Sequence, residues 1–207
     1  MTSLWYQTVL LKLDSGSKVL DVGMGTCTSL LANQSLISEK ELVFVGVDYN
    51  EDYVLAAKRN ISKTETINKG SVESHFGSVY DELLLQSITP KNKFDAIYFS
   101  GSLSLMPEPI EALKVSSSFL KKDGRIFITQ TYQNPKCREN YILNLFLKNV
   151  KPLLKYITTV DFGQLIYEDD MLQVFQESGF TIVEHAVIFG SVDNVWQKAF
   201  LTVLKVS

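Results

Sequence analysis

One stretch, Lys18 to Leu31, constrains the fold of this chain more than any other. It reads KVLDVGMGTCTSLL. Val19, Leu20 and Val22 form a short apolar run, as expected for a strand that is buried on both faces. Two glycines follow, and glycine lets a backbone turn tightly and approach a ligand closely. The stretch predicts a strand, a glycine turn and the start of a helix, whose free N–H groups can face an electron-rich ligand.

A second apolar run, LVFVGVD over residues 42–48, ends in the acid Asp48. This acid lies 23 residues after Gly25. Nucleotide-binding folds place a carboxylate against the ribose hydroxyls at a similar spacing, about 20 residues. Thr26 or Thr28 is expected to cap the helix between the two strands. A strand, glycine turn, helix and acid-terminated strand in this order predict a Rossmann-like α/β fold.

These two motifs, VLDVGMG over residues 19–25 and VGVD over residues 45–48, resemble those of class I S-adenosyl-L-methionine-dependent methyltransferases. Asp21 stands two residues before the first glycine. A carboxylate there would repel the pyrophosphate of a dinucleotide, whereas a sulfonium cofactor carries a cationic amine and a cationic sulfur. The chain departs from the most common family pattern at Cys27, which replaces a third glycine that mainly permits close helix packing. Because cysteine is small, we expect the site to survive with a slightly different helix approach.

The resemblance implies which residues bind the cofactor. The ribose acid would be Asp48, an aromatic ring at Tyr49 would pack against adenine, and Ser78 would stand where the family often has an aspartate for the adenine amino group. Asp81 follows three residues later, so the form of the adenine contact stays open. The full implied set is Asp21, Gly23, Met24, Gly25, Asp48, Tyr49, Ser78, Val79, Ser100 and Gly101.

The resemblance extends over nearly the whole chain. A helix is expected over residues 4–13 and a turn over residues 119–124. The last two strands are separated by about nine residues, too few for the crossover that parallel strands need, so they should form an antiparallel hairpin. We therefore expect a single α/β domain over residues 1–207, with a Rossmann-like seven-stranded, mostly parallel sheet, a C-terminal antiparallel hairpin and helices on both faces. The later strands are expected at residues 71–77, 93–100, 125–132, 180–188 and 198–206.

Residues 133–163 form an insertion relative to the minimal family fold, with a helix expected over residues 139–150. The insertion leaves the carboxyl end of the fifth strand, where the loops of α/β proteins carry function. Only a short segment precedes the first strand, so the site is either open or covered from elsewhere. We expect the insertion to cap the active site; an interface for a homodimer is the alternative.

Composition narrows the function classes. The formal net charge of −3 argues against a broad phosphate-binding face. The two cysteines, Cys27 and Cys137, predict neither a disulfide framework nor a zinc site, and indicate reduced thiols in a cytoplasmic protein. No apolar run approaches the roughly 20 residues that span a bilayer, so no membrane partner is expected.

The sequence assigns no catalytic residue and no metal site. His75 and His185 fall within expected strands and are interpreted as structural; Gln130, Tyr132 and Asp161 are candidates for substrate contact. The favoured function is methyl transfer to an O or N atom of a small or medium-sized acceptor. A protein or RNA acceptor in an open site, or a non-catalytic accessory subunit with the same fold, stays open. A nicotinamide oxidoreductase is opposed by Asp21 and by the terminal hairpin.

Overall fold

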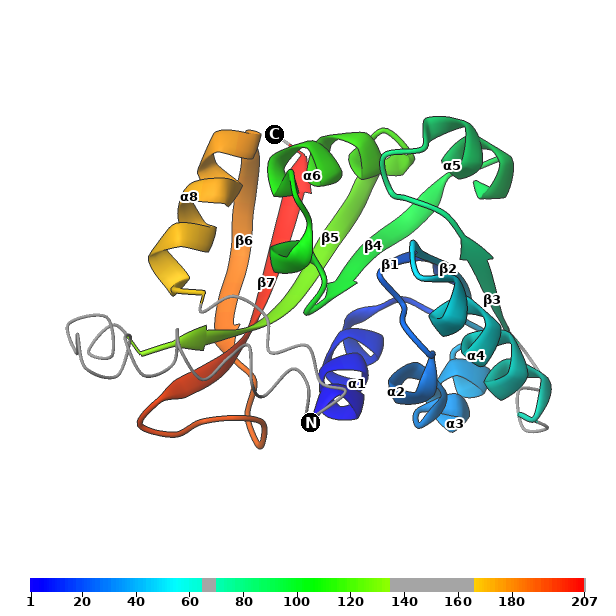
Figure 1. The fold of residues 1–207 in the computed structure, drawn as a ribbon, viewed down its shortest axis with the longest axis horizontal. Helices are drawn as coiled ribbons and strands as arrows, with labels where there is room; N and C mark the ends of the chain where they lie inside the picture. Colours follow the sequence, from blue (N-terminus) through cyan, green and yellow to red (C-terminus); the bar gives the residue numbers. More distant parts are fainter. Residues whose placement is uncertain (65–69, 135–165, 207) are drawn as a thin grey trace.

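The computed structural model describes residues 1–64, 70–134 and 166–206. Its centre is one seven-stranded sheet with the order β3-β2-β1-β4-β5-β7-β6 (Figure 1). The strands are β1 (Lys18–Val22), β2 (Val43–Asp48), β3 (Ser71–Phe76), β4 (Phe94–Ser100), β5 (Leu120–Gln133), β6 (Phe180–Val187) and β7 (Gln197–Val206).

The strands up to β5 pair in parallel, and β7 runs antiparallel to both of its neighbours, β5 and β6. The short link between β6 and β7 requires this, because a parallel crossover needs a dozen residues or more. The predicted fold class is confirmed, including the terminal hairpin. In this order β1 lies between β2 and β4, so the loops that follow these three strands meet at one edge of the sheet.

Helices cover both faces of the sheet. One face carries α1 (Thr2–Lys12), α2 (Thr28–Leu31), α3 (Gln34–Glu39) and α4 (Glu51–Ser62); the other carries α5 (Glu82–Ile88), α6 (Pro109–Ser117) and α8 (Glu168–Ser178). A short 3-10 turn, η1 (Leu103–Leu105), follows β4. Leu10 and Ile37 are fully buried on the first face, and Leu113 and Phe175 on the second. Each layer is held to the sheet by apolar burial.

Local sequence explains several helix ends. The Asn50 side chain accepts from the N–H of Tyr53 at the start of α4, and Asp81 accepts from the N–H of Leu84 at the start of α5. Gly179 ends α8 in the left-handed region, with φ +81°. None of the helices in the described part of the chain is long and apolar enough to cross a membrane.

Two local expectations are wrong. Residues 120–124 are strand rather than turn: Leu120 pairs with Phe94, and a register shift next to Phe94 lets β5 continue past the irregularity. Neither Thr26 nor Thr28 caps α2, the helix after the glycine loop. The residue before α2 is Cys27, which has φ +63°, and no side chain caps this helix. Cys27 therefore adopts the left-handed conformation for which glycine is suited, so the third glycine of the family serves the backbone turn as well as helix packing.

The expected helix over residues 139–150 lies outside the described residues, as does nearly all of the 133–163 insertion.

Removing the Phe175 ring tests how strongly α8 is held. Phe175 is completely buried, so Phe175→Ala should lower the free energy of unfolding by about 3–5 kcal/mol, measured by denaturant unfolding. Leu83, which is 78% exposed, is the control, because Leu83→Ala should change stability by less than about 0.5 kcal/mol. Equal effects would show that α8 contributes little to the core.

Candidate cofactor and methyl-transfer site

The loop after β1 is fastened to the end of β2. The N–H of Gly23 donates to the carbonyl oxygen of Val47 at 2.8 Å. The N–H of Gly25 donates to Oδ2 of Asp48 at 2.8 Å, and the N–H of Asn50 donates to Oδ1 of the same carboxylate at 2.9 Å. The spacing of 23 residues thus brings the glycine turn and the strand-end acid into direct contact.

The two glycines have different surroundings. Gly23 has φ +77°, and a Cβ there would lie 2.5 Å from Cβ of Ser102 in the loop after β4. Ser102 also donates its hydroxyl to the carbonyl oxygen of Val22. Gly25 has φ +60°, and no described atom lies within 4 Å of the place where its Cβ would be. Gly23 therefore permits close packing between two loops, whereas Gly25 borders open space that could receive a ligand.

Asp21 is completely buried beneath this loop. Its Oδ2 accepts from the hydroxyl of Tyr6 at 2.8 Å, while its Oδ1 is buried with no hydrogen-bond partner among the described residues. Burial raises the pKa of Asp21 to about 7; the Tyr6 hydrogen bond opposes this rise and the charge of Asp48 adds to it. A buried carboxylate oxygen without a hydrogen bond lowers the stability of the folded state unless a donor or a cation binds to it.

No cation compensates these acids within the described part of the chain. The ion pairs of the described residues join neither Asp21 nor Asp48 to a Lys, Arg or His. Burial, with a smaller contribution from Asp21, raises the pKa of the nearby Cys27 thiol to about 12. Burial also raises the pKa of Tyr98. The thiol and the phenol are therefore neutral near pH 7, and the site has the charge that suits a cationic ligand.

The other residues of the predicted cofactor-binding set differ in how far their side chains are exposed. Tyr49 is 80% exposed beside Asp48, so its ring is available to a ligand. The side chains of Met24 and Val79 are buried, and Met24 packs against Gly46, where an added Cβ would collide with it. Met24 and Val79 could therefore serve a ligand only through their backbones. The hydroxyl of Ser78 accepts from the N–H of Tyr80 at 3.2 Å.

Ser100 and Gly101 end β4 at the same edge of the sheet. Gly101 donates its N–H to the carbonyl oxygen of Thr129 at 2.8 Å, and the Thr129 hydroxyl lies 2.9 Å from the hydroxyl of Tyr98. A Cβ on Gly101 would lie 3.3 Å from the Trp5 ring. The end of β4 is therefore packed between β5 and α1.

Comparison with known proteins identifies the family. A family model described as a methyltransferase domain matches residues 13–197. The chain belongs to this methyltransferase family. The resemblance to class I S-adenosylmethionine-dependent methyltransferases, found first in the glycine loop and Asp48, is thus confirmed.

The methyltransferase also has more specific relatives. It is 28% identical over 146 residues to a demethylmenaquinone methyltransferase of Bacillus cereus strain AH187, a match that covers 70% of this chain and 57% of that protein. Its fold is similar to that of the MccD protein, with a TM-score of 0.69 and 15% identity over 99% of this chain and 96% of that one. A methyltransferase from Geobacter sulfurreducens, solved with S-adenosyl-L-homocysteine, gives a TM-score of 0.64 and 14% identity over 99% and 90% of the two chains.

No pattern in the sequence indicates that α1 contributes to the site. Besides the Tyr6 bond to Asp21, Trp5 donates its indole N–H to the hydroxyl of Ser191 at 2.8 Å in the β6–β7 link. The Tyr6 ring packs edge-on against Tyr98, with ring centroids 4.9 Å apart. Short as it is, the N-terminal segment contacts the loop acid, the end of β4 and the hairpin. Since these contacts join distant parts of the chain, no local pattern could have indicated them.

The side toward β5 contains further polar groups. Ser104 donates to Oε1 of Gln130 at 3.0 Å, and Gln130 is buried. His185 contacts the hydroxyl of Thr202 through Nδ1 at 2.8 Å and Glu168 through Nε2 at 3.0 Å. Because both ring nitrogens are engaged, these contacts agree with the structural interpretation of His185.

Tyr132 and Asp161 are the remaining sequence candidates for substrate contact. Tyr132 is buried, and its hydroxyl has no hydrogen-bond partner of normal geometry among the described residues. Burial raises the pKa of Tyr132, and the nearby Thr202 opposes that rise. Asp161 lies outside the described residues. Within the described ranges, no three His, Cys, Asp or Glu side chains are grouped so that they could hold a metal ion.

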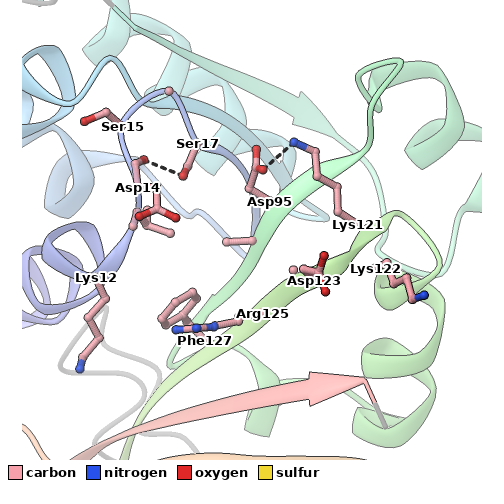
Figure 2. Close-up of a pocket in the computed structure, with 14 residues that line it drawn as sticks. Lys12, Asp14, Ser15, Ser17, Asp95, Lys121, Lys122, Asp123, Arg125 and Phe127 are labelled. Atoms are coloured by element: carbon pink, nitrogen blue, oxygen red, sulfur yellow. Dashed lines mark hydrogen bonds and ion pairs between the residues drawn. The ribbon is translucent and has the colours of Figure 1, made fainter.

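A pocket of about 610 Å³ lies at the opposite edge of the sheet, where β1, β4 and β5 begin (Figure 2). Lys121 and Asp95 form an ion pair of 2.5 Å across it, and Lys12 pairs with Glu184 at 2.9 Å. None of the predicted cofactor residues lines this pocket. Three of its charged groups, Lys12, Asp95 and Lys121, already have partners, and the predicted cofactor residues lie at the other edge, so size alone does not make it the candidate site.

Replacing Asp21 with asparagine should change how stability depends on pH. The raised pKa means that the folded protein keeps a proton that the unfolded chain loses above about pH 4, so stability falls as pH rises from about 4 to about 7. Between pH 5 and pH 8 the wild-type free energy of unfolding should fall by about 2–3 kcal/mol more than that of Asp21→Asn. Denaturant unfolding at both pH values measures this; parallel pH profiles would show that Asp21 does not titrate in this range.

Proposed function

We propose that this methyltransferase binds S-adenosyl-L-methionine at the glycine loop and transfers its methyl group to an O or N atom of a small or medium-sized acceptor. The observation that carries the proposal is a pair of buried acids, Asp21 and Asp48, beside the open space at Gly25 and without a cationic partner among the described residues. A sulfonium cofactor brings the positive charge that these acids lack. The Geobacter neighbour, solved with S-adenosyl-L-homocysteine, supports the cofactor class.

Each acid has capacity left for a ligand. Both oxygens of Asp48 already accept one backbone N–H, but a carboxylate oxygen has two lone pairs, so each could also accept from a ribose hydroxyl. Oδ1 of Asp21 is available for the cofactor amine. The exposed ring of Tyr49 could pack against adenine, and Ser78 with the backbone of Val79 could meet its edge.

The bound cofactor would supply the activated methyl group and its leaving group, so the chain has to provide alignment and exclude water. The end of β4, at Ser100 and Gly101, would present the methyl group toward the acceptor. Ser104 in η1 and Gln130 on the neighbouring strand β5 form a polar pair that could orient an acceptor by hydrogen bonding. A base is required only if the acceptor must lose a proton.

A small acceptor agrees with the Bacillus relatives, whose name specifies demethylmenaquinone as the substrate. The matched region spans 57% of their length, so their substrate is a guide to the class of acceptor and no more. The net charge of −3 argues against the broad basic face that RNA binding needs.

We further propose that residues 133–163 cap the acceptor side. The described residues on either side of this segment meet at the carboxyl end of β5. The N–H of Gln133 donates to the carbonyl oxygen of Ile166 at 2.8 Å, and Gln133 forms a parallel bridge with Tyr167. The chain thus leaves and rejoins the described structure next to the strand that carries Gln130, where the segment could choose the acceptor. A homodimer interface is the competing role.

A matched pair of glycine variants tests the cofactor site. Gly25 and Gly16 both have positive φ, and no described atom lies within 4 Å of either Cβ position, but Gly16 lies at the opposite edge of the sheet. Both alanine variants should lose about 1–2 kcal/mol of stability from the left-handed backbone. Only Gly25→Ala should weaken S-adenosylmethionine binding, by tenfold or more, because its methyl group would occupy the ligand space.

Titration calorimetry measures this binding, with NAD as the comparison ligand. Wild-type protein should bind S-adenosylmethionine or its demethylated product far more tightly than NAD. Binding of NAD alone would overturn the proposed cofactor, and equal losses in the two glycine variants would remove Gly25 from the site.

Replacing residues 136–163 with a short Gly/Ser link tests the capping role. Cofactor affinity should be retained, because the glycine loop and Asp48 are untouched, while turnover of the acceptor should be lost. The acceptor is first found by screening metabolite, protein and RNA fractions with labelled cofactor. Persistent turnover together with a change from dimer to monomer, seen by light scattering, would favour the interface role instead.

A further inference from the structure

We propose that Tyr6 of α1 is a positioning residue for the cofactor, which holds one oxygen of Asp21 so that the other remains as a charged acceptor for the cofactor amine. This inference rests on the proposed function. It adds a role for the N-terminal helix, and it predicts that cofactor binding releases a proton.

The geometry singles out Tyr6. Both Tyr6 and Asp21 are buried, and their hydrogen bond of 2.8 Å is the one hydrogen bond of the Asp21 carboxyl group within the described part of the chain. The hydroxyl donates to Oδ2, so Oδ1 keeps its lone pairs. A phenol that donates to a carboxylate stabilises the charged form and also fixes the plane of the group.

Apart from Tyr6, none of the described groups that are coupled to Asp21 stabilises its charged form. Tyr6 from α1, Tyr98 from β4 and Cys27 from the glycine loop are electrostatically coupled to it, and each is neutral near pH 7 because burial raises its pKa. Asp48 at the end of β2 is the remaining neighbour, and its negative charge opposes ionisation of Asp21. The Tyr6 hydrogen bond is the one influence that favours the charged carboxylate.

Proton release follows from this balance. With a pKa of about 7, Asp21 holds a proton in part of the ligand-free molecules at neutral pH. A cationic amine at Oδ1 would favour the carboxylate and displace that proton. Affinity should therefore rise with pH below the midpoint and level off above it.

The helix that carries Tyr6 is fixed to the site at other points. Trp5 is bonded to Ser191, and the hydroxyl of Thr2 lies 2.6 Å from that of Ser29 on α2. The Tyr6 ring also contacts Tyr98 edge-on. Removing only the Tyr6 hydroxyl should thus leave the helix in place, which makes Tyr6→Phe a clean test.

The experiment measures S-adenosyl-L-homocysteine binding by calorimetry between pH 6 and pH 8.5, in buffers of different ionisation enthalpy. This ligand keeps the amine and has no methyl group to transfer. Tyr6→Phe should bind about tenfold more weakly at pH 7, with its pH midpoint moved upward, and the difference from wild type should narrow at pH 8.5.

Tyr98→Phe is the matched control. It also removes a buried phenol hydroxyl, but that hydroxyl bonds to Thr129 and not to Asp21, so its pH midpoint should equal that of wild type. Asp21→Asn should bind without releasing a proton. Site-specific fluorotyrosine at position 6, whose hydroxyl is a stronger donor, should move the midpoint downward and keeps the test usable if Tyr6→Phe does not fold.

Each outcome has one meaning. An upward shift in Tyr6→Phe alone supports the proposal. Equal shifts in Tyr6→Phe and Tyr98→Phe, or a wild-type profile without proton release, overturn it while the cofactor site stands. Absence of binding by wild-type protein at every pH would instead overturn the proposed function, and this inference with it.

Discussion

The Asp48 carboxylate is the contact on which the functional edge of this molecule depends. Its two oxygens accept the N–H groups of Gly25 and Asn50, so it joins the loop after β1 to the start of α4. With the bond from the N–H of Gly23 to the carbonyl oxygen of Val47, it holds the loop against the end of β2. The acid that is proposed to meet a ribose therefore also shapes the backbone around it. Under the proposed function, one side chain would serve both binding and local structure.

Much of the fold could be predicted because it follows from local patterns. Apolar runs indicated the strands, and the short link after β6 required an antiparallel hairpin. Residues 120–124 were mistaken for a turn because a strand beside a register shift has no regular alternation. The positive φ of Cys27 could not be predicted either, because cysteine rarely adopts that conformation.

The site was predictable where its residues follow one another and hidden where distant elements meet. The glycine loop and Asp48 belong to motifs, so their contact could be foreseen. Tyr6 reaches Asp21 from α1, and Ser102 reaches Val22 from the loop after β4; the residue types of both are ordinary. The buried state of Asp21, with one oxygen left without a donor among the described residues, could be known only from the packing around it.

The bridge between Gln133 and Tyr167 has an evolutionary consequence. It closes the chain at the base of an intervening segment, so the sheet and α8 keep their register whatever lies between. Closing a longer loop is inexpensive, since each doubling of length adds only about 0.6 kcal/mol. A change of length at this point therefore adds little loop-closure cost to the folding of the domain. If the segment meets the acceptor as proposed, selection for a new acceptor could act there while the cofactor site is left unchanged.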